Sequence, residues 1–156
     1  MRRIERIACA MRASLVVGLL ATGLPVQADA ITDCNLEAGK IIGAADLKPP
    51  PANRVLAIVH TAAYQAVNAI TRRYPDDGLM PGAAPDASID AAVAAASHAA
   101  LSKLLPTQQV AIDASYQAAL AKIADGPAKS AGIGVGQRAA QAVLACLLYT
   151  SDAADE

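Results

Sequence analysis

The stretch NRVLAIVHTAAYQAVNAITRRY, residues 53–74, carries the clearest periodic pattern in the chain. Apolar residues recur in it every three or four positions, the spacing of one side of an α-helix. These residues are Val55, Val59, Ala62, Ala66 and Ile70. The other side of the same helix is polar, with Arg54, Thr61, Gln65, Asn68 and Arg72. Because an apolar helix face must be buried against other elements, this stretch predicts a helical domain.

The segments on either side of this helix are also readable from their residue types. Residues 31–47 predict a short first helix with Leu36, Ile41, Ile42 and Ala45 near one face. The KPPP run at 48–51 is expected to be an extended link, because consecutive prolines cannot continue a helix. On the far side, residues 75–88 are dense in Pro, Gly and Asp and predict a loop.

Three more helices are predicted after that loop. The first covers 89–105, with Asp86 or Ser88 as its cap and an apolar stripe of Ile89, Val93, Ala96, Ala100 and Leu104. The second covers 107–124, with Pro106 in its first turn, Gly126 at its end, and Ile112, Tyr116, Ala119 and Ile123 along one side. The third covers 128–145, with Asp125 as cap, Pro127 as first residue, and Ala131, Val135, Ala139 and Ala142 on its inner side.

Composition supports an all-α helical bundle of about five helices in one domain. The chain has 156 residues, of which 54% are hydrophobic and only 3% aromatic, so the apolar content is mostly Ala. Gly132, Gly134 and Gly136 fall within the last predicted helix, where they indicate that a neighbouring helix crosses closely. With Gln137 in place of a third fingerprint Gly and no preceding strand, they do not predict a nucleotide site. The net charge of −1, without a basic cluster, argues against nucleic acid as a partner.

The first thirty residues have the pattern of an export signal. Basic residues precede the apolar run SLVVGLLATGL at 14–24, and small residues follow at Ala28 and Ala30. Residues 1–30 are therefore expected to be a cleaved signal peptide of a periplasmic or secreted protein, with no stable membrane span after cleavage. The alternative is an N-terminal membrane anchor, for which the apolar run is slightly short. Cleavage leaves Cys34 and Cys146, which the compartment permits to pair but which two cysteines alone do not show to be paired.

The polar residues do not form a recognisable catalytic or metal motif. His60, Tyr64 and Asn68 lie one turn apart along a single helix, but no second cluster of ligands accompanies them, and zinc needs three or four. His98 stands alone, so both histidines are expected to be hydrogen-bonded rings on packed helices. The aspartates are expected to cap, turn or remain solvated; they are Asp76, Asp77, Asp113 and Asp125. No Gly-x-Ser-x-Gly turn presents a nucleophile.

Three stretches together resemble the N-terminal helical half of bacterial vanadium-dependent haloperoxidase-like proteins, which belong with the type 2 phosphatidic acid phosphatases. They are residues 53–70, residues 91–137, and the Tyr74-Pro75 turn between them. The most specific piece is IADGPAKSAGIGVGQRAA at 123–140, and the resemblance covers roughly residues 50–145. Gln65 departs from the family pattern, which often has an acid at this position.

The resemblance implies a helical bundle whose pocket binds vanadate or phosphate. In the family, a Lys, two Arg, Ser and Gly donors and two His surround the oxyanion, because charge-assisted donors stabilise its trigonal-bipyramidal form. These groups come from Lys…Arg-Pro, Pro-Ser-Gly-His and Ser-Arg…His segments, which this sequence lacks. Lys103 and Arg138 have no such context. No catalytic, cofactor-binding or metal-binding residue is therefore predicted here, and vanadate is expected only in an intact parent protein.

The last residues, CLLYTSDAADE at 146–156, resemble the conceptual translation of a sequencing-library transposase adapter. We therefore expect a truncated haloperoxidase-like helical portion at 31–145, followed by an artefact at 146–156. The alternative is that residues 146–156 are an ordinary polar C-terminal tail. The predicted function is that of an exported N-terminal scaffold fragment, inactive alone, whose partner is the missing C-terminal half of its own domain. The parent could be a haloperoxidase or a phosphatase. The rival prediction is a small, complete periplasmic helical interaction protein without enzymatic activity.

Overall fold

The computed structural model describes residues 30–75 and 77–152 of the chain. Of the predicted signal peptide, only Ala30 lies within these ranges. Asp76 and residues 153–156 also lie outside them. The described residues form five α-helices and no strand, which confirms the all-α prediction. The helices are α2 (Ala30–Ala44), α3 (Pro49–Thr71), α4 (Ile89–Leu104), α5 (Gln109–Ala121) and α6 (Pro127–Asp152), with a 3₁₀ turn, η1 (Pro106–Gln108), before α5.

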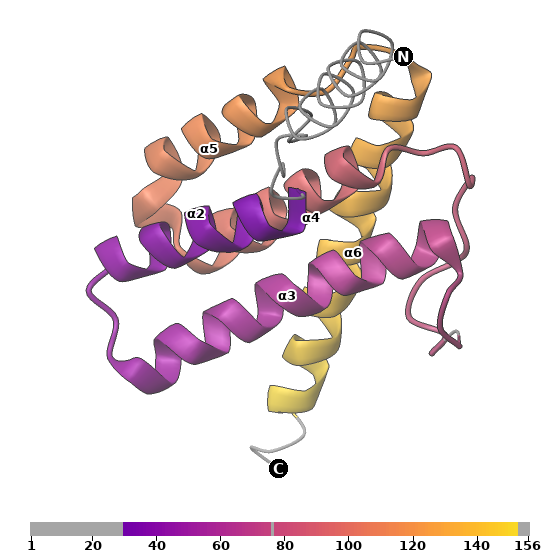
Figure 1. Cartoon of the computed structure of the whole chain (residues 1–156). Helices are drawn as coiled ribbons and strands as arrows, with labels where there is room; N and C mark the ends of the chain where they lie inside the picture. Colours follow the sequence, from indigo (N-terminus) through magenta and orange to yellow (C-terminus); the bar gives the residue numbers. More distant parts are fainter. Residues whose placement is uncertain (1–29, 76, 153–156) are drawn as a thin grey trace, which may run out of the picture.

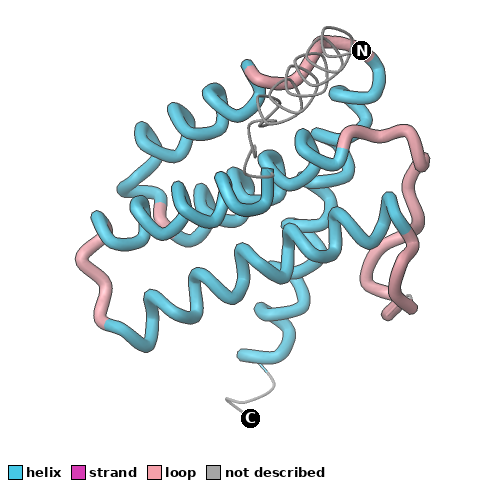
Figure 2. Tube along the Cα trace, viewed as in Figure 1, coloured by secondary structure: helices cyan, strands magenta, loops and turns pink. Residues whose placement is uncertain are grey.

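Helix α4 is the centre of the fold. Figure 1 shows α2, α3, α4 and α5 lying roughly side by side, with α6 crossing α3 and α4, and α4 contacts all four other helices. Figure 2 shows the long loop that connects α3 to α4 at one end of the bundle. The core is made largely of Ala, Val and Ile, so neighbouring helix backbones can approach closely.

The crossing of α4 and α6 depends on two glycines. A Cβ atom at Gly132 would overlap the Ser88 carbonyl oxygen, and one at Gly136 would overlap the Ala92 carbonyl oxygen. Gly134 faces away from this contact, toward the side chain of Arg138. The predicted close approach of a neighbouring helix is confirmed, and the neighbour is α4.

Two helix starts show how local chemistry acts in this fold. The prediction of an extended KPPP link is wrong, because Pro49, Pro50 and Pro51 form the first turn of α3. The first-turn N–H groups of a helix have no partner within it, so the missing N–H of proline is tolerated there. At the start of α4, the Ser88 hydroxyl oxygen accepts a hydrogen bond of 3.2 Å from the Ala91 N–H, so Ser88 is the cap.

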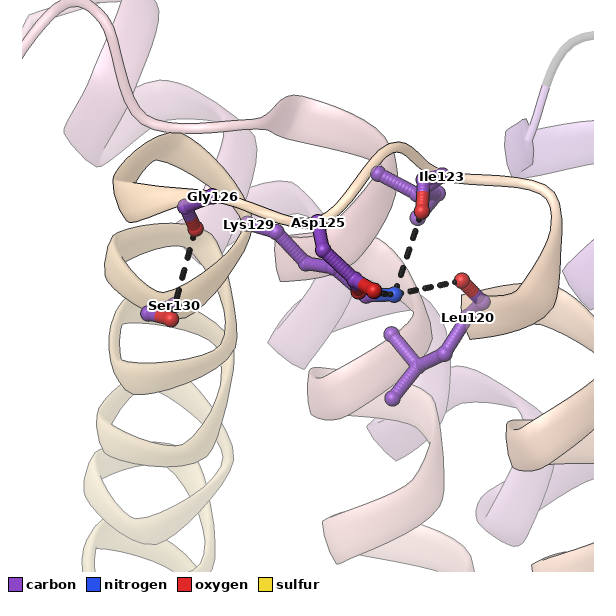
Figure 3. A network of polar contacts seen from close by, with 6 residues as sticks. All are labelled: Leu120, Ile123, Asp125, Gly126, Lys129 and Ser130. Atoms are coloured by element: carbon purple, nitrogen blue, oxygen red, sulfur yellow. Dashed lines mark hydrogen bonds and ion pairs between the residues drawn. The ribbon is translucent and has the colours of Figure 1, made fainter.

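The junction between α5 and α6 differs from the prediction. Helix α5 ends at Ala121, before the predicted end at residue 124, and Pro127 begins α6 as expected. Lys129 reaches back across the junction and donates hydrogen bonds to the Leu120 and Ile123 carbonyl oxygens at 2.8 and 3.1 Å (Figure 3). It also pairs with Asp125 at 2.8 Å, so Asp125 anchors this lysine. The lysine thus adds hydrogen bonds to carbonyl groups at the end of α5, of which that of Leu120 also accepts from the Ile123 N–H at 3.1 Å.

The predicted helix faces are largely but not fully correct. All five predicted apolar residues of α3 are buried. Leu36 and Ala131, predicted to face inward, are exposed, whereas Gln65, predicted to be on the polar side, is buried. Helix α6 also continues past Ala145 to Asp152, so no helix end separates residues 31–145 from the segment that resembles an adapter.

Candidate functional site

A groove between α2 and α5 has a volume of about 670 Å³. Helix α5 contributes Ala111, Ala114 and Ala118 to it, and α2 contributes Leu36 and Ile41. Leu36 is 60% exposed, and the three alanines are exposed as well. The groove is therefore an apolar helix-lined surface on which small side chains leave room for a close neighbour.

The charges at the edge of this groove are paired with one another. Lys122, the residue that follows α5, contacts Asp33 of α2 at 2.8 Å, and Lys40 contacts Glu37 at 2.6 Å. The hydrogen bond with Asp33 raises the pKa of Lys122. All four side chains are substantially exposed, so these pairs add little to stability. Because both signs are already matched within the chain, the groove has no net charge to offer a strongly charged ligand.

Cys34 lies in the same groove and is half-buried. Burial, together with the charge of Asp33, raises the pKa of its thiol. A thiol with a raised pKa stays protonated at neutral pH and is a poor nucleophile or metal ligand. Cys34 and Cys146 are not joined by a disulfide.

His98 of α4 belongs to a polar cluster that attaches α5 to α4. Its Nε2 donates a hydrogen bond of 2.8 Å to Asp113 Oδ1, and its ring stacks on Tyr116 with centroids 4.3 Å apart. Gln109 donates to the same carboxylate oxygen at 2.8 Å and to the Ser102 hydroxyl oxygen at 3.1 Å. The hydrogen bond from His98, followed by that from Gln109, lowers the pKa of Asp113. Spacing alone could not find this cluster, because His98 and Asp113 are on different helices.

The predicted row of His60, Tyr64 and Asn68 is divided in the structure. His60 and Tyr64 line a hollow of about 300 Å³ between α2 and α3, together with Ile31, Asn35 and neighbouring apolar residues. Asn68 instead binds the loop after α3: its amide oxygen accepts from the Tyr74 N–H at 2.9 Å, and its amide nitrogen donates to the Tyr74 carbonyl at 3.3 Å. Asn68 therefore stabilises the loop after α3, whereas His60 and Tyr64 lie at a surface hollow.

The remaining polar candidates do not gather at one place. Lys103 and Arg138 are exposed on different helices. Asp77 accepts hydrogen bonds from the Leu79 N–H and the Gln65 amide, as expected for a turn residue. Within residues 30–75 and 77–152, no group of three His, Cys, Asp or Glu side chains could hold a metal ion.

Within the same described ranges, no helix has both the length and the apolar character needed to cross a bilayer. Among known proteins, no family model, no curated sequence and no solved structure matches this chain.

Proposed function

We propose that residues 31–145 are the scaffold part of an exported haloperoxidase-like or acid-phosphatase-like domain, and that the groove between α2 and α5 receives a helix from the rest of that domain. The observation that carries this proposal is the groove itself, which has a volume of about 670 Å³ and a mainly apolar lining with several alanines. The resemblance of residues 50–145 to the N-terminal half of that family supplies the kind of occupant.

The lining of the groove suits a helix. Ala111, Ala114 and Ala118 are three and four residues apart, so they form one row along α5. Small side chains in such a row allow a second helix to pack close to the backbone. Ile41 and the exposed Leu36 supply apolar contacts from α2. Because the edge charges are already paired, the occupant needs an apolar face rather than a charged one.

In this proposal the described helices position the chemistry without performing it. The Lys, Arg and His side chains that would hold vanadate or phosphate come from the other part of the domain. Their charge-assisted hydrogen bonds would stabilise a bound oxyanion, and a His among them would supply a ligand or a nucleophile. The scaffold's contribution is to hold that second part in one orientation.

The test compares this chain with a longer reading frame from the same gene. Vanadate is expected to bind the longer protein and not the present chain, measured by calorimetry. Ala114→Arg in the longer protein is expected to abolish binding by filling the groove, whereas Ala121→Arg, at an exposed position of α5 that does not line the groove, keeps it. A reading frame without Pro-Ser-Gly-His and Ser-Arg…His segments overturns the proposal, as does unchanged binding by Ala114→Arg.

One observation favours the rival, a complete helical interaction protein. Helix α4 is enclosed by α2, α3, α5 and α6, and every buried side-chain nitrogen or oxygen of the described residues has a hydrogen-bond partner. Thermal unfolding in the presence of a hydrophobic dye separates the two proposals. A scaffold lacking its other half is expected to bind the dye and unfold over a broad range. A sharp transition without dye binding favours the complete protein.

A further inference from the structure

We propose that the hollow between α2 and α3 binds a small, uncharged ring compound that carries a hydroxyl group. The hollow has a volume of about 300 Å³ and is lined by Ile31 and Asn35 of α2 and by His60, Ala63, Tyr64 and Val67 of α3. It is separate from the groove between α2 and α5, so this proposal stands or falls independently of the proposed function.

The hollow combines an apolar wall with three polar groups. Ile31 is 41% exposed and Tyr64 is 45% exposed, so both offer apolar surface to a ligand. Asn35 lies one turn after Ile31, and Tyr64 lies one turn after His60. Each helix therefore presents an apolar and a polar side chain to the same space, the arrangement typical of small-molecule sites.

The polar groups of this hollow differ from their neighbours in having no internal partner. Within the described part of the chain, the Asn35 amide, the His60 imidazole and the Tyr64 hydroxyl make no hydrogen bond to another residue. On the same helix, Gln65 is bonded to Asp77, and Asn68 is bonded to Tyr74. Helix α3 thus uses its other amide side chains for structure and leaves His60 and Tyr64 available to a ligand.

The ring of Tyr64 has an aromatic neighbour. It contacts the ring of Tyr74, with centroids 5.9 Å apart and planes inclined by 40°. The backbone N–H and carbonyl of Tyr74 are in turn hydrogen-bonded to the side-chain amide of Asn68. A braced ring on a long helix loses little freedom when a ligand packs against it, which favours binding.

The chemistry of the lining selects the ligand class. None of the six lining residues is Asp, Glu, Lys or Arg, and the nearest charges on α2 are paired at the other groove. A charged ligand would lose hydration here without gaining a counter-charge. A purely apolar ligand would cover three polar groups and leave them unpaired. A hydroxyl group can donate to one of these groups and accept from another, while a single ring fits the apolar wall.

The test is a titration of the ¹⁵N-labelled full chain with phenol, followed by NMR. Saturable shifts are expected at residues 31–35 and 60–67, with much weaker shifts for benzoate and for benzene. His60→Ala and Tyr64→Phe are each expected to weaken phenol binding about fivefold, the effect of one lost hydrogen bond. Thr61→Ala is the matched control, because Thr61 is exposed on the same helix and its hydroxyl donates to the Ala57 carbonyl.

His60 and Tyr64 are both exposed, so neither substitution should disturb folding, and circular dichroism verifies this. The proposal is overturned if phenol gives no saturable shifts, if its shifts map elsewhere, or if benzene or benzoate binds equally well. Unchanged affinity in both His60→Ala and Tyr64→Phe also overturns it.

Discussion

Helices α4 and α5 are neighbours of similar, alanine-rich sequence, yet they are held in the fold by different forces. Most of α4 is buried, including Ala92, Val93 and Ala96. In α5, which the structure describes from end to end, Ile112 is the one buried residue. The rest of α5 is half-buried or exposed, and the contact of His98 with Asp113 adds a polar attachment to α4. The position of α4 therefore depends on close packing over most of its length, whereas that of α5 depends on one buried apolar side chain, with half-buried residues and polar contacts around it.

The largest effect is expected where α4 meets α6. Gly136→Ala should lower the free energy of unfolding by about 3 kcal/mol, because the new methyl group meets the α4 backbone at Ala92 and Ala96. Urea unfolding followed by circular dichroism measures this change. The matched control is Gly134→Ala, whose methyl group meets only the Arg138 side chain at 3.3 Å. This control should gain about 1 kcal/mol from helix propensity. Equal stability of the two variants would contradict the glycine contact.

The apolar anchor of α5 is the next largest effect. Ile112→Ala should lower the free energy of unfolding by about 2–3 kcal/mol, because Ile112 is 1% exposed and truncation leaves a cavity against α4. Val110→Ala, on the same helix at an 87% exposed position, should change stability by less than about 0.5 kcal/mol. If both variants behave alike, Ile112 does not anchor α5.

Lys129 tests the polar attachment at the end of α5. Its side chain is only 15% exposed and donates to the Leu120 and Ile123 carbonyls. Lys129→Met keeps the chain length but removes the hydrogen bonds to both carbonyls, so it should cost about 1–2 kcal/mol. Hydrogen exchange should also become faster over residues 119–123. Lys103→Met, at an exposed position at the end of α4, should leave exchange in that segment unchanged.

The smallest effect concerns the cluster around His98 and depends on pH. The pKa of Asp113 is lowered in the folded state by hydrogen bonds from His98 and Gln109, so its ionised form favours folding. This stabilisation is fully present above the ordinary aspartate pKa and is lost as pH falls through the lower folded value, that is, below about pH 4. Asp113→Asn should flatten the acid side of the stability profile relative to the unmodified chain. Asp86→Asn, in the exposed loop, should leave the slope unchanged.

Much of the helical pattern could be read from short stretches of sequence. The five apolar positions of α3, the Ser88 cap and the glycines of α6 all follow from residues within a few positions of one another. The errors had both long-range and local causes. Gln65 is buried because Asp77, in the loop that follows α3, turns back to accept its amide. The three prolines, predicted to be an extended link, instead begin α3, because the first turn of a helix tolerates proline.

The polar sites were harder to predict than the helices. His98 and Asp113 are 15 residues apart on different helices, and only the packing of α5 against α4 brings them within 2.8 Å. His60 and Tyr64 were recognised as one row, but their association with Ile31 and Asn35 depends on how α2 lies against α3. No periodicity within one helix contains that information.

By itself, the sequence determined that this protein is helical, that the predicted apolar stripe of α3 is buried, and that glycines of α6 meet another helix. These features depend on hydrophobic spacing and backbone sterics, which act over one or two helical turns. Only the tertiary structure decided that α4 lies at the centre, that Ile112 is the one buried residue of α5, and which side chains line each hollow. The reason is that alanine-rich faces are nearly equivalent as packing surfaces, so their partners are selected by the arrangement of the whole chain.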